Sequence, residues 1–284
     1  TAIGYNAGNE ITTGNSNTGV GKAALQALTT GSQNTAMGQG ALDAATTVDN
    51  ITAVGAQALS ALTTGVENTA VGMNAGPAMT TATSNTILGY RAGVAITTGS
   101  GNILIGQTSG DAITTSSSNI CIGSPAGGSI ITSGAGGNTF IGNSCGNNTT
   151  DAYRCVAVGS TSCGGNGNYN VAVGYDAFST NSTGGQNTCI GDAAGNSISS
   201  GGNNTCLGYE ADNSGATTSN EFTLGNASVD NLRCNDTSIS ALSDERDKAE
   251  VSNLPSAAGL DFINNLRPIT YYWDRREWYE DGEP

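Results

Sequence analysis

The chain has 284 residues, of which 42 are Gly, 11% are charged and 5% are aromatic, values that are unusual for a globular enzyme. Its net charge of −14, with nine Lys plus Arg and no His, disfavours nucleic acid and an anionic membrane as partners. No apolar run approaches the ~18 residues of a membrane-spanning helix, so we expect no membrane insertion.

No signal peptide is visible, the first residue is not Met, and the chain begins inside a repeat. We therefore expect a fragment or a processed product.

Seven Cys are present, an odd number, and none forms a Cys-x-x-Cys pair. Cys121, Cys189 and Cys206 occupy a position that is Ala in other repeats, and Cys145 replaces another small residue. Small buried side chains explain this pattern better than a disulfide framework. Without His, we also expect no metal site, and nothing in the sequence calls for a cofactor.

One motif, Asn68-Thr69-Ala70-Val71-Gly72, recurs with small changes over residues 1–225. Its Gly is found at Gly4, Gly21, Gly38, Gly55, Gly72, Gly89, Gly106, Gly123, Gly142, Gly159, Gly174, Gly191, Gly208 and Gly225. Eleven of these thirteen intervals are 17 residues, and the other two are 19 and 15. Such a register predicts a stacked repeat, in which each repeat packs on its neighbours.

The residues before the Gly predict a short strand. With the Gly counted as position 4 of each repeat, position 3 is always apolar and mostly β-branched, and position 2 is mostly apolar. Adjacent strand residues point to opposite faces, so we expect both faces to be buried. One face can line the inside of a coil. The other requires a second surface, and we infer that the chain associates with itself along the coil.

Other positions complete the predicted repeat. Position 7 carries small residues, which suggests close approach of backbones, and position 11 is often apolar. A pair such as Thr63-Thr64 then leads through a Gly to the next motif, so we expect two short strands and two turns per repeat. An Asn before each strand can hydrogen-bond to the repeats on either side, and these residues are Asn17, Asn34, Asn68, Asn85, Asn102, Asn119, Asn138, Asn170, Asn187 and Asn204.

Position 5 is usually polar, which marks the solvent side. Tyr5, Tyr90, Tyr175 and Tyr209 also occupy it. These rings can stack on the sugars of a receptor, although exposed tyrosines on a rod need no such function. The register loosens around residues 134–137 and 164–167, where we expect turns of altered length.

The composition changes after the last motif. The first 240 residues hold 4 Lys or Arg and 13 Asp or Glu, whereas the last 44 hold 5 and 10. We interpret residues 226–242 as a connector and expect a second module from Ser243. On spacing alone, Ser243 and Lys248 can form a Ser–Lys dyad, or Ser243 can simply cap a helix.

The second module resembles the start of the peptidase S74 family, the intramolecular chaperone of phage tailspikes and tail fibres. Ser243, Asp244, Arg246 and Lys248 match the opening of that family. A short helix ending in Leu266-Arg267-Pro268 and an aromatic strand ending at Trp273 match its continuation. The resemblance covers residues 243–284, which would be the N-terminal part of a truncated small α+β domain.

This resemblance implies a homotrimeric chaperone that helps the preceding fibre to trimerise and then cuts itself off. Ser243 would be the nucleophile and Lys248 the general base. The cut would fall between Leu242 and Ser243. No external substrate is expected.

The repeats have a resemblance of their own. The pattern Asn-x-Ala-Val/Ile-Gly is similar to the head repeats of trimeric autotransporter adhesins, which are left-handed parallel β-rolls packed as trimers. The resemblance implies an all-β fold over residues 1–225: a parallel β-roll or β-solenoid of ~17-residue repeats, left-handed and homotrimeric.

The leading hypothesis is a virion protein, the shaft of a trimeric phage tail fibre or spike that takes part in host attachment. Its partners would be further copies of itself, other tail proteins and a host cell-surface receptor, for which a glycan is one candidate. The alternative is the head of a bacterial trimeric adhesin at the cell surface. A soluble enzyme with an external substrate is disfavoured, because the acidic residues show no clustering in the repeats.

Overall fold

The structure is a computed structural model that describes residues 1–130 and 136–233. One compact unit, Thr1–Asp230, contains every strand of the described residues. Of the second unit, Asn231–Pro284, only residues 231–233 are described. The strands are β1 (Ala2–Ile3), β2 (Thr18–Val20), β3 (Thr35–Met37), β4 (Thr52–Val54), β5 (Thr69–Val71), β6 (Thr86–Leu88), β7 (Ile103–Ile105), β8 (Ile120–Ile122), β9 (Thr139–Ile141), β10 (Val156–Val158), β11 (Val171–Val173), β12 (Thr188–Ile190), β13 (Thr205–Leu207) and β14 (Phe222–Leu224).

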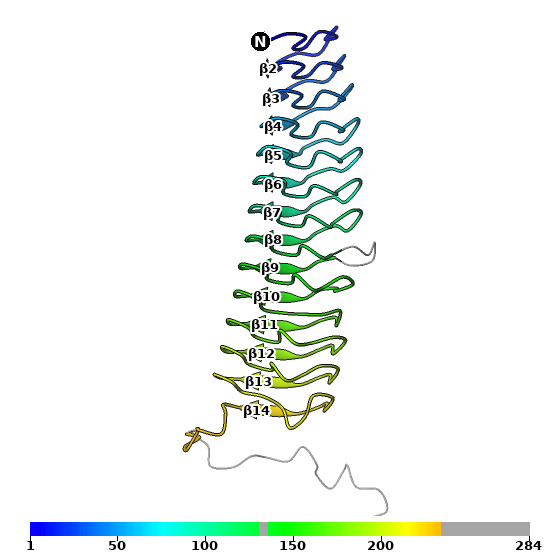
Figure 1. The fold of residues 1–284 in the computed structure, drawn as a ribbon. Coiled ribbons are helices and arrows are strands. Elements are labelled where there is room, and N and C mark those ends of the chain that lie inside the picture. The colour runs from blue at the N-terminus through cyan, green and yellow to red at the C-terminus, as the bar shows by residue number, and fades with distance from the viewer. Residues whose placement is uncertain (131–135, 234–284) are drawn as a thin grey trace, which may run out of the picture. The chain divides into compact units, whose positions relative to one another are not determined.

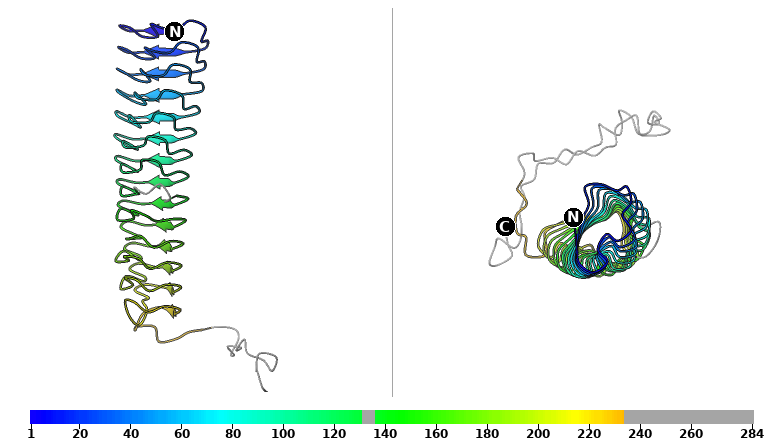
Figure 2. Two further views of the ribbon diagram at one scale, coloured as in Figure 1. Left: turned by 90° about the vertical axis from the view of Figure 1, so that its right-hand side faces the viewer. Right: turned by 90° about the horizontal axis from the view of Figure 1, so that it is seen from above.

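The fourteen strands form one parallel sheet in sequence order, with each strand bonded to the next. The register follows the 17-residue interval, so that Val54 pairs with Val71 and Val71 with Leu88. The strands stack along one side of a coil (Figure 1), and the view from above shows successive turns lying over one another (Figure 2). The predicted parallel β-solenoid of ~17-residue repeats is therefore confirmed, and each turn of the coil is called a rung below.

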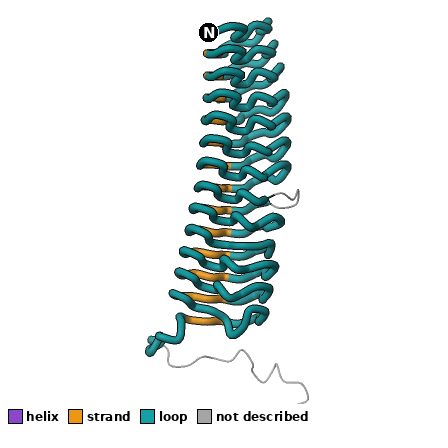
Figure 3. The backbone as a smooth tube through the Cα atoms, in the orientation of Figure 1, coloured by secondary structure: helices purple, strands orange, loops and turns teal. Residues whose placement is uncertain are grey.

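Each rung contains one strand, so the prediction of two strands per repeat is wrong (Figure 3). The rest of the rung bends too often for a strand to form. Ala23 and Leu25, at positions 6 and 8, have φ of 59° and 56°, and Gln33 at position 16 has φ of 62°. These left-handed residues interrupt extended backbone. Rung-to-rung bonds persist nonetheless, as from the Thr12 N–H to the Thr29 carbonyl at 2.9 Å.

The interior of the coil is lined by positions 2, 7 and 11. In the rung of β4, Ala53, Ala58 and Leu62 are fully buried. Neighbouring backbones also touch at position 7, where the Ala41 carbonyl accepts a 3.1 Å bond from the Leu25 N–H. The burial of positions 2 and 11 and the close approach at position 7 agree with expectation.

The side chains at positions 2 and 8 of one rung share the same interior space. Where position 2 is small, as at Ala53, position 8 is large, as at Leu59, and both are fully buried. Where position 2 is Phe140, position 8 is Gly146, and a Cβ added to Gly146 would overlap the Phe140 ring. The size of one side chain therefore offsets the size of the other, which keeps the rung width constant and the interior closely packed.

The Asn at position 17 forms a buried ladder inside one corner of the coil. The Asn85 Nδ2 donates to the Asn68 Oδ1 at 3.1 Å, and the Asn102 Nδ2 donates to the Asn85 Oδ1 at 3.1 Å. All three side chains are 0–1% exposed. The predicted ladder is confirmed. Ile51 and Cys155 interrupt it, and their backbone N–H groups still bond to the Asn Oδ1 of the preceding rung.

Candidate functional site

The predicted cleavage site lies outside the described residues. Ser243, Lys248 and the Leu242–Ser243 bond all belong to this stretch, as do the expected helix and aromatic strand. The dyad therefore stays a prediction from the sequence. The sites that can be built from geometry lie on the coil.

The largest distinct surface is an apolar stripe along the outer face of the strands. The stripe consists of the position 3 side chains, from Ile3 in β1 to Leu224 in β14. Because position 2 points into the coil, position 3 points out. Leu88 is 44% exposed, in a rod where position 2 of the same strand, Ile87, is 1% exposed. The expectation that both faces are buried thus holds for the inner face only in a single chain.

The stripe offers side chains and little free backbone. Each strand already bonds to both neighbours, apart from the two end strands. A partner would therefore pack against the stripe rather than extend the sheet. A contiguous exposed apolar surface in a soluble protein usually marks a protein–protein contact. The stripe is the candidate interface of the rod.

The four tyrosines at position 5 are exposed, as expected. Their exposed fractions run from 43% for Tyr90 to 73% for Tyr5. Tyr5, Tyr90 and Tyr175 occupy rungs that are five 17-residue steps or their equivalent apart, so their rings do not adjoin. Single rings of this kind are common on protein surfaces and define no site by themselves.

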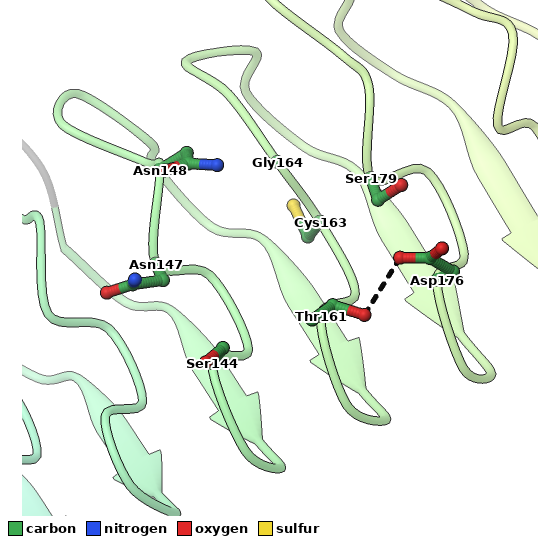
Figure 4. A pocket seen from close by; sticks show the side chains of 8 residues that line it. All are labelled: Ser144, Asn147, Asn148, Thr161, Cys163, Gly164, Asp176 and Ser179. Atoms are coloured by element: carbon green, nitrogen blue, oxygen red, sulfur yellow. Dashed lines mark hydrogen bonds between the residues drawn. The ribbon is translucent and has the colours of Figure 1, made fainter.

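Polar cavities lie on a different side of the rung from the stripe. The larger departure from regularity is the 15-residue interval between Gly159 and Gly174, and a cavity of about 320 Å³ lies beside this short rung (Figure 4). It is lined by Ser144, Asn147, Asn148, Thr161, Cys163, Gly164, Asp176 and Ser179. A second cavity, of about 340 Å³, adjoins Gln57 and Asp43 at corresponding positions of rungs near the N-terminus.

The cavity beside the short rung offers hydrogen bonds but no catalytic pair. The Thr161 Oγ1 donates to the Asp176 Oδ1 at 2.8 Å, so the single carboxylate already has a partner (Figure 4). Burial and contact with Cys155 raise the pKa of the Cys163 thiol well above its usual range, which keeps it protonated and a poor nucleophile. This arrangement can hold a small polar molecule and lacks the means to activate one.

The six cysteines among the described residues are buried and free, in agreement with their predicted role as small interior side chains. Cys189 and Cys206 face each other in the register of β12 and β13. Burial raises the pKa of the Cys121 thiol to about 12. Within the described residues, no cluster of His, Cys, Asp or Glu has the arrangement of a metal site.

Sequence reasoning missed one cluster. The rings of Tyr153 and Tyr169 meet edge to face with centroids 5.8 Å apart, and the Arg154 guanidinium lies 4.8 Å from the Tyr153 centroid. The two tyrosines are 16 residues apart, which does not match the 17-residue register. They become neighbours because the short rung shifts the alignment between β10 and β11.

No helix of the described residues is long and apolar enough to cross a membrane.

Comparisons of the chain with protein-family models, with curated proteins and with solved structures give no match. The resemblances to phage chaperones and to adhesin heads therefore depend on the residues quoted for them.

Proposed function

We propose that the chain is the shaft of a homotrimeric phage tail fibre or spike, followed by a self-cleaving chaperone that assists trimerisation. The observation that carries the proposal is the outer stripe. A rod whose backbone is bonded from rung to rung has no structural need for an apolar residue on the outside of every strand. A second surface of the same kind, repeated at the same interval, would cover it.

Three copies of the chain would supply that surface. In a symmetric assembly of parallel rods, position 3 of each strand meets equivalent apolar side chains at every rung. Association would exclude water from the stripe, at roughly 25 cal/mol for each Å² of apolar area covered. The number three and the left hand of the coil come from the resemblance to adhesin heads. The trimer would belong to the virion, bind other tail proteins and attach to a host receptor.

We expect light scattering to give the complete chain a mass three times the 28.3 kDa of one copy. The double substitution Leu88→Glu and Ile105→Glu places two charges on the stripe in neighbouring strands. It should give monomers, because both charges would lose water in the interface.

The matched control is Tyr90→Glu, since Tyr90 is 43% exposed, much like Leu88 at 44%, but lies after the strand. It should remain trimeric. A monomeric wild type at micromolar concentration would contradict the proposal.

Autoproteolysis is tested with a gene that includes the whole C-terminal domain. The wild type should yield a product that ends at Leu242. Ser243→Ala should remain uncut, because alanine lacks the attacking hydroxyl, and Lys248→Met should do the same. Intact mass spectrometry locates the cut. A wild-type chain that stays whole, or an alanine variant that is still cut at Leu242, would rule out the proposed dyad.

The alternative is a head of a bacterial trimeric adhesin, which the repeat pattern fits equally well. The Ser-Asp-x-Arg-x-Lys opening at Ser243 favours the phage fibre. Antibodies against the rod would label virions in the first case and the bacterial envelope in the second.

A further inference from the structure

The cluster of Tyr153, Arg154 and Tyr169 differs from the same corner of the other rungs. Position 16 has a left-handed backbone in each rung where it is described, and small or amide side chains usually occupy it. Those residues are Ser16, Gln33, Asn50, Glu67, Ser84, Gly101, Ser118, Gly137, Gln186, Asn203 and Asn220. Arg154 and Tyr169 have φ of 53° and 59° at this position. Gly and Asn adopt such angles most readily, whereas a bulky residue does so at a cost.

Burial does not explain these large side chains. Tyr169 is 50% exposed, and Arg154 is exposed as well. The exposed ring of Tyr169 adds little to the interior of the coil. A strained backbone position that carries an exposed aromatic ring is better explained by a ligand than by stability.

The Arg154 guanidinium is free to bind an anion. It lies over the Tyr153 ring, which fixes its direction, and no ion pair joins it to a carboxylate of the described residues. A guanidinium offers several N–H donors in one plane and binds carboxylates with two parallel hydrogen bonds. Asn168 adds a further donor at this corner, since its Oδ1 accepts the Tyr153 N–H at 3.0 Å and its Nδ2 remains available.

The charge of the whole chain restricts the kind of anion. A net charge of −14 repels densely charged polymers such as nucleic acids. That repulsion is screened beyond about 8 Å at physiological salt, so a single carboxylate next to Arg154 is governed by Arg154 itself. An exposed tyrosine ring in turn offers an apolar face for the C–H groups of a sugar ring and a hydroxyl for its polar edge.

We propose that Tyr153, Arg154 and Tyr169 form a binding site for a carboxylated sugar, in which the sugar ring packs on the exposed tyrosine and its carboxylate accepts hydrogen bonds from Arg154. The inference rests on the proposed attachment function and names the class of receptor, a glycan that carries uronic or sialic acid residues. In the proposed trimer, each copy would present the site at the same height of the shaft, so that one glycan-coated surface could engage several sites.

The test begins with the complete chain on an array of uronate-bearing, sialylated and neutral oligosaccharides. At least one carboxylated probe should bind. Methyl esterification of that probe keeps the sugar ring and removes the charge, and it should lower the affinity at least about tenfold.

The variants return the corner to the residues that other rungs use. Tyr169→Asn and Arg154→Gln match Asn50 and Gln33 at the same position, so the fold should be kept, which thermal unfolding checks. Each should weaken binding at least about tenfold, the effect of losing one stacking or charged contact. The matched controls are Tyr175→Ala and Arg91→Gln, which remove an exposed ring and an exposed cation elsewhere and should change affinity less than about twofold.

Three results would overturn the inference: binding of neutral glycans alone or of none, equal binding of the ester, and unchanged binding by Tyr169→Asn. A change of oligomeric mass in Tyr169→Asn would also overturn it, since the cluster would then be a contact between copies. The fibre proposal is tested separately. A trimeric, self-cleaving chain that binds no carboxylated sugar leaves the fibre standing, and a monomeric, uncut chain that binds one leaves the sugar site standing.

Discussion

Gly89→Ala should destabilise the coil by roughly 4 kcal/mol or more, among the largest effects of any single substitution in the rod. Gly89 follows β6 and has φ of +143°, a conformation that residues with a Cβ rarely adopt. A Cβ built there would lie 2.6 Å from the carbonyl carbon of Gly106 in the next rung. Neither backbone can move away easily, because the Gly106 N–H donates to the Leu88 carbonyl at 2.8 Å.

Gly101→Ala is the matched control. Gly101 also has a positive φ, of +67°, but the nearest atom to its added Cβ is 3.8 Å away. The cost should be limited to the left-handed conformation, about 1 kcal/mol. Comparison of the two variants therefore separates the clash between rungs from the loss of glycine's conformational freedom.

Urea unfolding followed by circular dichroism measures both effects. Because each rung contacts only its neighbours, the Gly89→Ala coil should also open locally, and limited proteolysis should cut between β5 and β7 before the rest of the rod unfolds. Equal midpoints for Gly89→Ala and Gly101→Ala would show that the rungs are not held as closely as the coordinates place them.

The features that the sequence predicts well are those repeated in every rung. The motif Gly, the buried Asn and the apolar residues at positions 2 and 11 recur at a fixed interval, and each has one physical reason that applies all along the rod. Strand existence follows from the apolar, β-branched residues at position 3. The interval itself sets the parallel register, since Val54 and Val71 are 17 residues apart and pair directly.

The second strand of each repeat was predicted wrongly because local preference was overridden by packing. Leu25 and Leu42 have little preference for the left-handed region, yet both have φ above 50°. Their side chains are buried in space left by small residues at position 2, Gly19 and Ala36. Burial of a leucine offsets the conformational cost, and this exchange involves two positions that are six residues apart in each rung.

The sugar site was missed for a related reason. Tyr153 and Tyr169 stand at different positions of their repeats, so a strict 17-residue alignment keeps them apart. Their contact depends on how the 15-residue interval is accommodated between β10 and β11, which no local pattern reveals. Sequence analysis indicated instead the isolated tyrosines at position 5, since these recur at one position of the repeat. The predicted dyad at Ser243 is a local motif and awaits its own test.

Asn85→Ala should cost about 3 kcal/mol or more, although the side chain that it removes is small. Asn85 sits in the longest unbroken part of the ladder, from Asn68 to Asn138. Its Nδ2 donates to the Gly99 carbonyl at 3.0 Å, and its Oδ1 accepts the Asn102 N–H at 2.9 Å. Alanine can replace neither bond.

The cost arises from the groups left behind. After the substitution, the Asn102 N–H loses the partner that Asn85 supplied, and one bond to the Gly99 carbonyl is lost. Asn102 is 0% exposed, so water cannot reach it without opening the coil. An unsatisfied buried donor or acceptor costs about 1–3 kcal/mol, and two such groups give the expected total. The ladder above Asn85 would also lose the bond between the Asn102 Nδ2 and the Asn85 Oδ1.

Asn15→Ala is the matched control, because Asn15 is exposed and only its backbone N–H bonds to the next rung, at the Ser32 Oγ. It should change the free energy of unfolding by less than about 0.5 kcal/mol. Hydrogen exchange should further show faster exchange at the Asn102 amide in Asn85→Ala than in wild type. If Asn85→Ala unfolds at the same urea concentration as Asn15→Ala, the ladder does not hold the rungs together, and the stability of the rod must come from its apolar interior alone.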